Sequence, residues 1–188
     1  MIERLRKALA QRPLSRINDS KPKVSAVLVP VFLKGGQYHL LFIQRTGRVR
    51  EHKGQISFPG GAYEKADKTL LETALREAKE EIGLAPSDVE ALGELDDMLT
   101  VSTNYIISPF VGLIPFPYKF ELDQWETEEL IEAPIAVLQK KGCFNEEITI
   151  IDGQEVVGYT FKYGEKVIWG ATARILKQFL ELIDSQIA

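Results

Sequence analysis

Three glutamates on one predicted helix are the residues best suited to chemistry. Glu77, Glu80 and Glu81 lie close together in the chain. At about 100° per residue they fall within roughly a third of the helix circumference, on the side away from the apolar residues of the same segment. Carboxylates this close repel one another, so we expect a compensating cation. Oxygen ligands favour Mg²⁺ or its substitute Mn²⁺. The alternative is an acidic face exposed to solvent.

The helix that carries these glutamates has sequence signals at both ends. Thr69 followed by Glu72 is a capping-box pattern, which predicts that the helix begins there. Gly83 stands where a left-handed C-terminal cap is expected. Apolar residues recur between them at helical spacing and predict a buried stripe, formed by Leu71, Leu75, Ala78 and Ile82.

A basic segment precedes this helix. Residues 45–55 contain Arg45, Arg48, Arg50, His52 and Lys53, although the whole chain has a net charge of −4. Arginine offers paired donors to phosphate oxygens and lysine a point charge, so the segment is suited to hold phosphate groups. The alternative is a solvated loop that offsets nearby acids.

Composition limits the classes of protein that the chain can be. Its 188 residues are enough for one domain with a substantial core, and we expect a single domain over residues 1–188. The acidic net charge argues against nonspecific nucleic-acid binding. Cys143 is the only cysteine, which excludes an intrachain disulfide. No apolar run approaches membrane-spanning length, and the charged N-terminus does not resemble a signal peptide. The expected location is the cytoplasm.

The order of predicted elements indicates an α+β protein. A short amphipathic helix is expected at residues 2–10. Strands are then expected at 24–33, 38–44, 89–95, 105–113, 147–151 and 156–162, with a short helix at 135–139. A last helix should run from about 170 to 183. Its apolar face is expected to join the core, and the alternative is a contact between two copies in a homodimer.

Residues 61–84 resemble the box of the Nudix hydrolase family. The box is Gly, five residues, Glu, seven residues, then Arg-Glu-hydrophobic-any-Glu-Glu-any-Gly-hydrophobic. Its second half matches the run Arg76-Glu77-Ala78-Lys79-Glu80-Glu81-Ile82-Gly83-Leu84. In the first half Asp67 replaces Glu, and eight residues rather than seven separate it from Arg76. The partner of Arg76 is therefore open, and Glu72, one turn earlier, is a local candidate.

The resemblance implies the Nudix fold, an α-β-α sandwich with a central mixed sheet, and metal-dependent hydrolysis of a diphosphate. It implies that the metal ligands are Glu77, Glu80, Glu81 and the backbone carbonyl of Gly61. The residue that takes the proton is left open between Glu80 and a later acidic segment, where Glu126 and Glu129 are the candidates. That segment resembles the family stretch Glu-x-x-Glu-x-x-Glu-x-Pro, and its alternative is a solvated lead-in to the helix at 135–139.

The chain also resembles the coenzyme A diphosphatase branch of this family. The resemblance rests on Leu41-Phe42-Ile43-Gln44-Arg45-Thr46, Arg50, Gly54-Gln55 and Phe58-Pro59-Gly60-Gly61. It implies that coenzyme A is the substrate and that Arg45, Arg50 and Lys53 hold its phosphates. Thr103-Asn104-Tyr105 departs from the Ser-Gly-Phe that the branch often carries. Two alternatives are a hydrolase for another nucleoside diphosphate derivative and a catalytically silent binding module, although such modules should lack a box glutamate.

Overall fold

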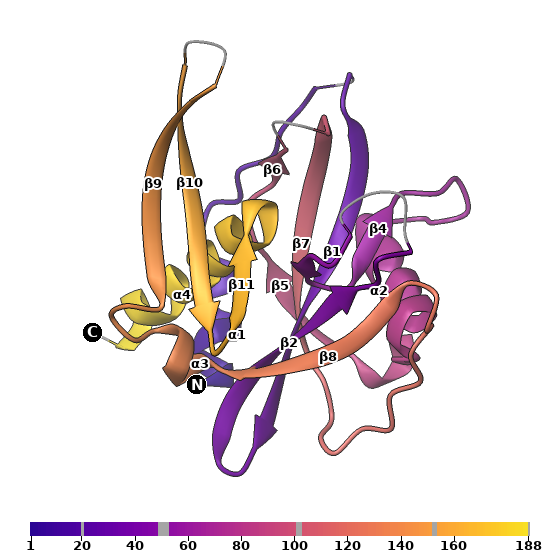
Figure 1. Cartoon of the computed structure of the whole chain (residues 1–188). Helices are drawn as coiled ribbons and strands as arrows, with labels where there is room; N and C mark the ends of the chain where they lie inside the picture. Colours follow the sequence, from indigo (N-terminus) through magenta and orange to yellow (C-terminus); the bar gives the residue numbers. More distant parts are fainter. Residues whose placement is uncertain (20, 49–52, 101–102, 152–153, 188) are drawn as a thin grey trace.

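The computed structural model describes residues 1–19, 21–48, 53–100, 103–151 and 154–187. In chain order its elements are α1 (Ile2–Gln11), β1 (Lys23–Lys34), β2 (Gln37–Arg45), β3 (Ile56–Ser57), β4 (Gly60–Ala62), α2 (Leu70–Ile82), the 3-10 turn η1 (Pro86–Asp88), β5 (Glu90–Glu94), β6 (Met98–Leu99), β7 (Tyr105–Leu113), β8 (Thr127–Pro134), α3 (Ile135–Leu138), β9 (Phe144–Ile151), β10 (Gln154–Tyr163), β11 (Lys166–Trp169) and α4 (Gly170–Ile187) (Figure 1).

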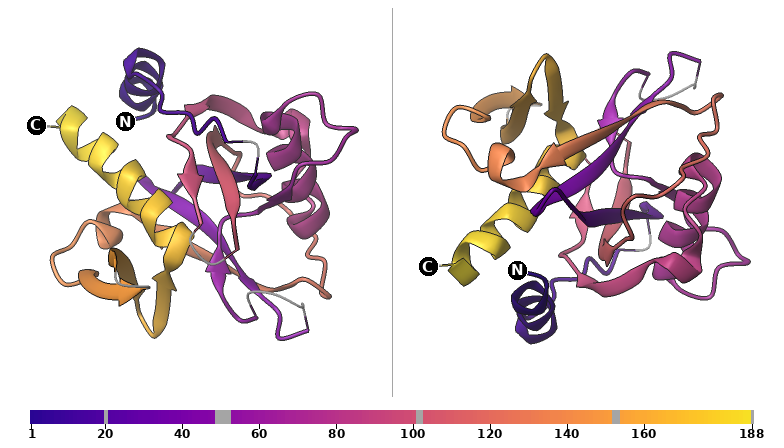
Figure 2. Two further views of the ribbon diagram at one scale, coloured as in Figure 1. Left: turned by 90° about the horizontal axis from the view of Figure 1, so that it is seen from above. Right: turned by 90° about the horizontal axis from the view of Figure 1, so that it is seen from below.

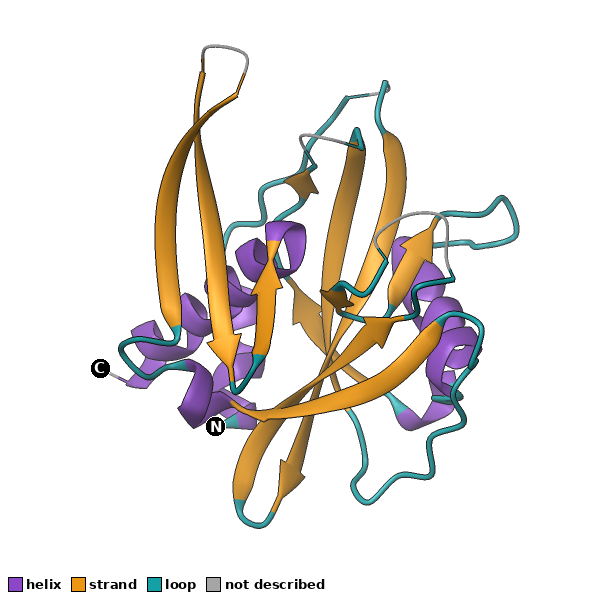
Figure 3. Ribbon diagram, in the orientation of Figure 1, coloured by secondary structure: helices purple, strands orange, loops and turns teal. Residues whose placement is uncertain are grey.

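Two sheets organise these elements (Figure 3). The larger sheet has eight strands, with the order β3-β2-β1-β7-β5 and with β4, β6 and β8 pairing to β1, β7 and β2. It is mixed, because β1 runs parallel to β7 and antiparallel to β2 and β4. The smaller sheet is antiparallel, with the order β11-β10-β9.

Helices cover both faces of the larger sheet (Figure 2). Alternate side chains of β1 point to opposite faces. Ala26 and Leu28 belong to the buried cluster that includes α2 residues. Val29 and Val31 belong to the cluster that includes residues of α1 and α4. The expected α+β class and the α-β-α sandwich with a mixed central sheet are confirmed.

The predicted ends of the box helix are confirmed. The Thr69 hydroxyl accepts a hydrogen bond of 3.1 Å from the backbone N–H of Glu72. Gly83 closes α2 in the left-handed conformation, with φ of 69°. These signals are local, so they can be read without knowledge of the tertiary structure.

The last helix also follows the prediction. Leu176 and Phe179 are fully buried in the core beneath the sheet. Burying a side chain of this size stabilises the fold by about 1.5–3 kcal/mol. The apolar face of α4 is therefore core. Among the described residues, no helix is long and apolar enough to cross a membrane.

No strand is predicted in the acidic segment before α3, but the structure has one there. Residues from Thr127 form the strand β8, which pairs antiparallel with β2. Ile131 and Ala133 are buried at alternate positions. This alternation is the strand signal, but it is weak because acidic residues dominate the segment.

Candidate metal and diphosphate site

The strand β4 and the helix α2 meet at Gly61 and Glu77. Gly61 lies opposite Ala26 of β1, which places it at the edge of the sheet that α2 covers. A Cβ atom on Gly61 would lie 2.5 Å from the carboxylate atom Oε1 of Glu77. A side chain at this position would collide with the carboxylate. Glycine at this position therefore lets the backbone approach Glu77 without displacing its carboxylate.

Glu81 lies at the centre of the site and is only 3% exposed. Its Oε2 accepts a hydrogen bond of 2.9 Å from the backbone N–H of Gly60, and its Oε1 accepts one of 3.0 Å from Arg45. Burial raises the pKa of Glu81 to about 8, against the opposing effects of Gly60 and Arg45. The prediction that all three box glutamates lie away from the buried side of the helix is wrong for Glu81, because the backbone of Gly60 in β4 and the side chain of Arg45 contact its carboxylate.

Glu77 and Glu80 share a different cation, Arg76. The guanidinium atom Nη1 donates to Glu77 Oε1 at 2.9 Å and to Glu80 Oε2 at 3.3 Å. Burial raises the pKa of Glu77, and Arg76 opposes that rise. The Glu80 side chain is 59% exposed. The three box glutamates thus occupy three environments: buried, half-buried and solvent-facing.

Asp67 is the partner of Arg76. Its two carboxylate oxygens accept hydrogen bonds of 3.1 Å from Nε and Nη2 of the guanidinium. Hydrogen bonding to Arg76 lowers the pKa of Asp67 to about 2. The prediction of Glu72 as the partner is wrong, because the Glu72 carboxylate accepts a hydrogen bond from the backbone N–H of Lys68 instead. The available signal was Asp67 itself, which stands close to the first acidic position of the box.

Arg45 joins the site to the later acidic segment. Its Nη1 contacts Glu81 at 3.0 Å and its Nη2 contacts Glu126 at 3.4 Å. The pairing of β2 with β8 shifts register between Gln44 and Arg45, so Arg45 lies opposite Thr127, the residue after Glu126. This irregularity brings Glu126 to the box, although 45 and 126 lie far apart in the sequence.

Glu129 has different neighbours. It lies opposite Gln44 on β2, and its carboxylate pairs with Lys166 of β11. Lys166 also donates to the Gln44 side-chain oxygen at 2.6 Å. Glu129 therefore faces the smaller sheet, whereas Glu126 contacts the cation that reaches Glu81.

The predicted phosphate-binding residues that the structure describes lie in different environments. Arg45 lies among the carboxylates that contact it and Arg76, whereas Lys53 is exposed to solvent. We call these carboxylates the carboxylate cluster: Asp67, Glu77, Glu80, Glu81 and Glu126. Arg50 and His52 lie outside the described residues.

Comparison with known proteins agrees with this architecture. Residues 22–141 match the model of the NUDIX domain. The chain belongs to the Nudix family. Two relatives, each called an uncharacterized Nudix hydrolase NudL, come from Photorhabdus laumondii and Pectobacterium atrosepticum. They are 32% and 36% identical to this chain, over 92% and 93% of it and 90% of each relative.

Solved Nudix structures share the fold at low sequence identity. A MutT/nudix family protein from Enterococcus faecalis has a TM-score of 0.61 and 17% identity. The superposition covers 93% of this chain and 66% of the Enterococcus chain. The NUDIX domain of Shewanella oneidensis NrtR, solved with ADP ribose, has a TM-score of 0.56 and 16% identity, and covers 97% of both chains. These likenesses support the fold, and the family match identifies the chain as a Nudix hydrolase.

Nudix hydrolases generally use divalent metal ions such as Mg²⁺ or Mn²⁺. In the arrangement that the described residues adopt, no three acidic, histidine or cysteine side chains form a complete metal site. The carboxylates pair with two guanidinium groups instead: Arg45 contacts Glu81 and Glu126, and Arg76 contacts Asp67, Glu77 and Glu80. Burial raises the pKa values of Glu77 and Glu81. A cation bound beside them would oppose this rise, because it favours the charged carboxylates. Oxygen donors of this kind suit Mg²⁺ or Mn²⁺.

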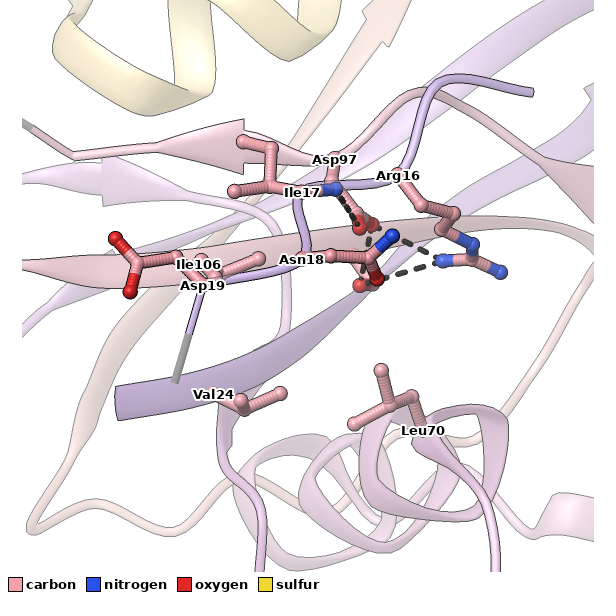
Figure 4. Close-up of a pocket in the computed structure, with 9 residues that line it drawn as sticks. Arg16, Ile17, Asn18, Asp19, Val24, Leu70, Asp97 and Ile106 are labelled. Carbon is pink, nitrogen blue, oxygen red and sulfur yellow. Dashed lines mark hydrogen bonds and ion pairs between the residues drawn. The ribbon is translucent and has the colours of Figure 1, made fainter. Parts of the chain in front are cut away.

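A separate hollow of about 620 Å³ opens at the other end of α2, between β1, β7 and the segment after α1 (Figure 4). The start of α2 contributes Leu70, whereas the box glutamates lie in its second half. Asp97 accepts hydrogen bonds from Arg16, from the backbone of Ile17 and from the buried hydroxyl of Ser108. These groups satisfy one another, and none of the predicted site residues lines the hollow.

Proposed function

We propose that this Nudix hydrolase cleaves the diphosphate linkage of coenzyme A or acyl-coenzyme A. The products would be 4′-phosphopantetheine, or its acyl form, and adenosine 3′,5′-bisphosphate. The observation that carries the proposal is the contact of 3.0 Å between Arg45 and Glu81. Arg45 belongs to the signature of the coenzyme A branch, and Glu81 belongs to the box. The contact therefore joins the two motifs directly.

The carboxylates suit this reaction because a diphosphate resists attack by water. Its negative oxygens repel the nucleophile, and neutral water is a weak nucleophile. A bound divalent ion, when present, neutralises phosphoryl charge and lowers the pKa of a bound water. In the proposal Glu77, Glu80, Glu81 and the Gly61 carbonyl hold Mg²⁺ or Mn²⁺. Arg76 orients Glu77 and Glu80, and Asp67 fixes the plane of Arg76.

A second group must accept the proton of the attacking water. Glu126 and Glu80 are both partly exposed and both touch a guanidinium group of the cluster. The geometry favours Glu126, because Arg45 holds it beside the buried Glu81 while its side chain remains 44% exposed. Glu129 is the weaker candidate because Lys166 binds it. Arg45, Arg50 and Lys53 are proposed to hold the phosphates of the substrate.

The proposal treats residues 1–188 as one catalytic unit in which α1 and α4 complete the core beneath the sheet. A panel of substrates tests the reaction: coenzyme A, acetyl-coenzyme A, ADP-ribose, a diadenosine polyphosphate and an oxidised nucleoside triphosphate, each with Mg²⁺. We expect kcat/KM to be highest for a coenzyme A substrate, with adenosine 3′,5′-bisphosphate identified as the product by chromatography. If ADP-ribose is cleaved as well as coenzyme A, the coenzyme A proposal is lost. If no substrate is cleaved, the silent binding module becomes the better interpretation.

A further inference from the structure

Trp125 is a large aromatic residue that the fold leaves in solvent beside the carboxylate cluster. Its side chain is 63% exposed. Its backbone is nevertheless firmly held, because the N–H donates to Asp123 Oδ1 at 2.8 Å and the carbonyl accepts from the Thr46 hydroxyl at 2.6 Å. The loop thus holds the backbone of Trp125 in place, although the exposed indole ring adds little to the stability of the fold.

The neighbours of Trp125 connect it to the candidate site. The next residue is Glu126, whose carboxylate contacts Arg45, and Arg45 reaches Glu81. The backbone N–H of Thr46 donates to the carbonyl of Glu126 at 2.9 Å, so the loop is fixed to the segment that follows β2. The start of β8 lies on the same side of the molecule as α2 (Figure 1). The backbone of Trp125 is therefore held next to Glu126, a residue of the carboxylate cluster.

A planar cation lies over the same ring. The guanidinium carbon of Arg48 is 5.9 Å from the centroid of the Trp125 ring system. Both side chains are exposed, so a flat ligand can reach them without disturbing the core. Nucleobases stack on aromatic rings and on guanidinium planes, and base–aromatic stacking tolerates any base because every base has a π-face.

We propose that Trp125 and Arg48 form the binding site for the purine base of the substrate. This inference rests on one part of the proposed function, namely that the substrate is a nucleoside diphosphate derivative cleaved at the neighbouring carboxylates. If the base stacks on Trp125, the nucleoside half of the substrate lies beside the start of β8. Arg48 adds positive charge where the phosphorylated ribose would lie.

Kinetics of Trp125 variants test this placement. For Trp125→Ala we expect KM to rise about tenfold, as expected for the loss of one base–aromatic stack, with kcat changed less than about twofold. Trp125→Phe retains an aromatic face and should recover most of the affinity, and Arg48→Gln should raise KM less than Trp125→Ala. The matched control is Ile148→Ala, which removes an apolar side chain of similar exposure, 64%, from β9 on the other side of the molecule (Figure 1). Its KM should equal that of the wild type.

Equilibrium binding separates this inference from the identity of the substrate. Adenosine 5′-diphosphate should quench tryptophan fluorescence of the wild-type protein, whereas pyrophosphate and 4′-phosphopantetheine, which lack a base, should not. The quenching should disappear in Trp125→Phe, where Trp169 is the remaining tryptophan. If ADP-ribose rather than coenzyme A is cleaved, the coenzyme A proposal fails while the KM effect of Trp125→Ala on ADP-ribose still supports the stacking site. An unchanged KM in Trp125→Ala for every cleaved substrate, or equal quenching in Trp125→Phe, would overturn the inference. A lowered melting temperature with unchanged KM would also overturn it, since that result assigns Trp125 to the stability of the loop.

Discussion

Asp67 accepts two parallel hydrogen bonds from Arg76, each 3.1 Å long, and thereby fixes the guanidinium against Glu77 and Glu80. The Thr73 hydroxyl and the backbone N–H of Glu64 donate to the same carboxylate. Asp67 is 8% exposed, so little water competes for these contacts. Paired bonds of this geometry are among the stronger polar contacts in proteins.

Replacing Asp67 by asparagine should destabilise the protein and weaken catalysis together. The amide cannot accept both hydrogen bonds from Arg76, so this part-buried cation loses one of its charged hydrogen-bond partners. We expect a loss of about 2 kcal/mol in the free energy of unfolding, measured with urea, the magnitude typical of hydrogen bonds to charged groups. The matched control is Glu72→Gln, whose side-chain oxygen can still accept from Lys68 N–H. If Glu72→Gln costs as much as Asp67→Asn, the assignment of Asp67 as the partner of Arg76 is wrong.

The stabilisation that Asp67 provides should decrease as the pH falls. The pKa of Asp67 is about 2 in the folded protein and 3.8 for the unperturbed side chain. Because the folded state binds this proton less readily, the stabilisation is present above the unfolded pKa and is lost as the pH falls from about 4 towards 2. The difference in unfolding free energy between wild type and Asp67→Asn should be constant near neutral pH and shrink below about pH 4. A difference that stays constant in acid would contradict the assignment.

Local features of the fold follow from the sequence because their causes are local. The box helix begins and ends where Thr69 and Gly83 predict, since a cap needs only its own turn. The predicted strand at residues 105–113 coincides with β7, whose residues Phe110 and Val111 are buried. An apolar run rich in β-branched residues is a local signal for a strand.

The pairing of charges does not follow from the sequence because it depends on distant segments. Arg45 meets Glu81 and Glu126 only after β2 has paired with β8 and the register has shifted beside Arg45. The burial of Glu81 likewise requires the backbone of Gly60 to lie over α2. The sequence predicts which residues carry charge, whereas the sheet register decides which of them touch.

Replacing Glu81 by glutamine should remove most activity and leave the fold intact. The amide keeps the shape of the side chain but not the negative charge that a divalent ion requires. Loss of even an outer partner of a metal ligand costs about 10–100-fold, so we expect a fall in kcat/KM of about 100-fold or more. Circular dichroism and the melting temperature should stay close to those of the wild type. Near-normal turnover by Glu81→Gln would remove this residue from the proposed ligands.

Replacing Gly61 by alanine should disturb the site through Glu77. The new Cβ atom would lie 2.5 Å from Glu77 Oε1, so the carboxylate must move. We expect activity to fall by about 10-fold or more, because a ligand group is displaced, while the melting temperature changes little. Gly158→Ala on β10 is the matched control, since its Cβ would meet its nearest neighbour, the Glu147 carbonyl, at an ordinary 3.6 Å. Equal activity of the two variants would show that Gly61 has no special role.

The two later glutamates offer a matched pair for locating the proton acceptor. Glu126 contacts Arg45 beside Glu81, whereas Glu129, only three residues later, contacts Lys166 of the smaller sheet. Loss of a general base typically lowers kcat by about 10²–10⁴-fold, so Glu126→Gln should lower kcat to that extent and Glu129→Gln should change it by less than about threefold.

The pH dependence of kcat distinguishes loss of a base from loss of a structural contact. With Glu126→Gln the acidic limb of the pH–rate profile should flatten, because the group that must be unprotonated is gone. With Glu129→Gln the profile should keep the shape of the wild type. If Glu80→Gln flattens the acidic limb while Glu126→Gln does not, the proton acceptor lies on the box helix, and the contact between Glu126 and Arg45 serves only to hold β8 against α2.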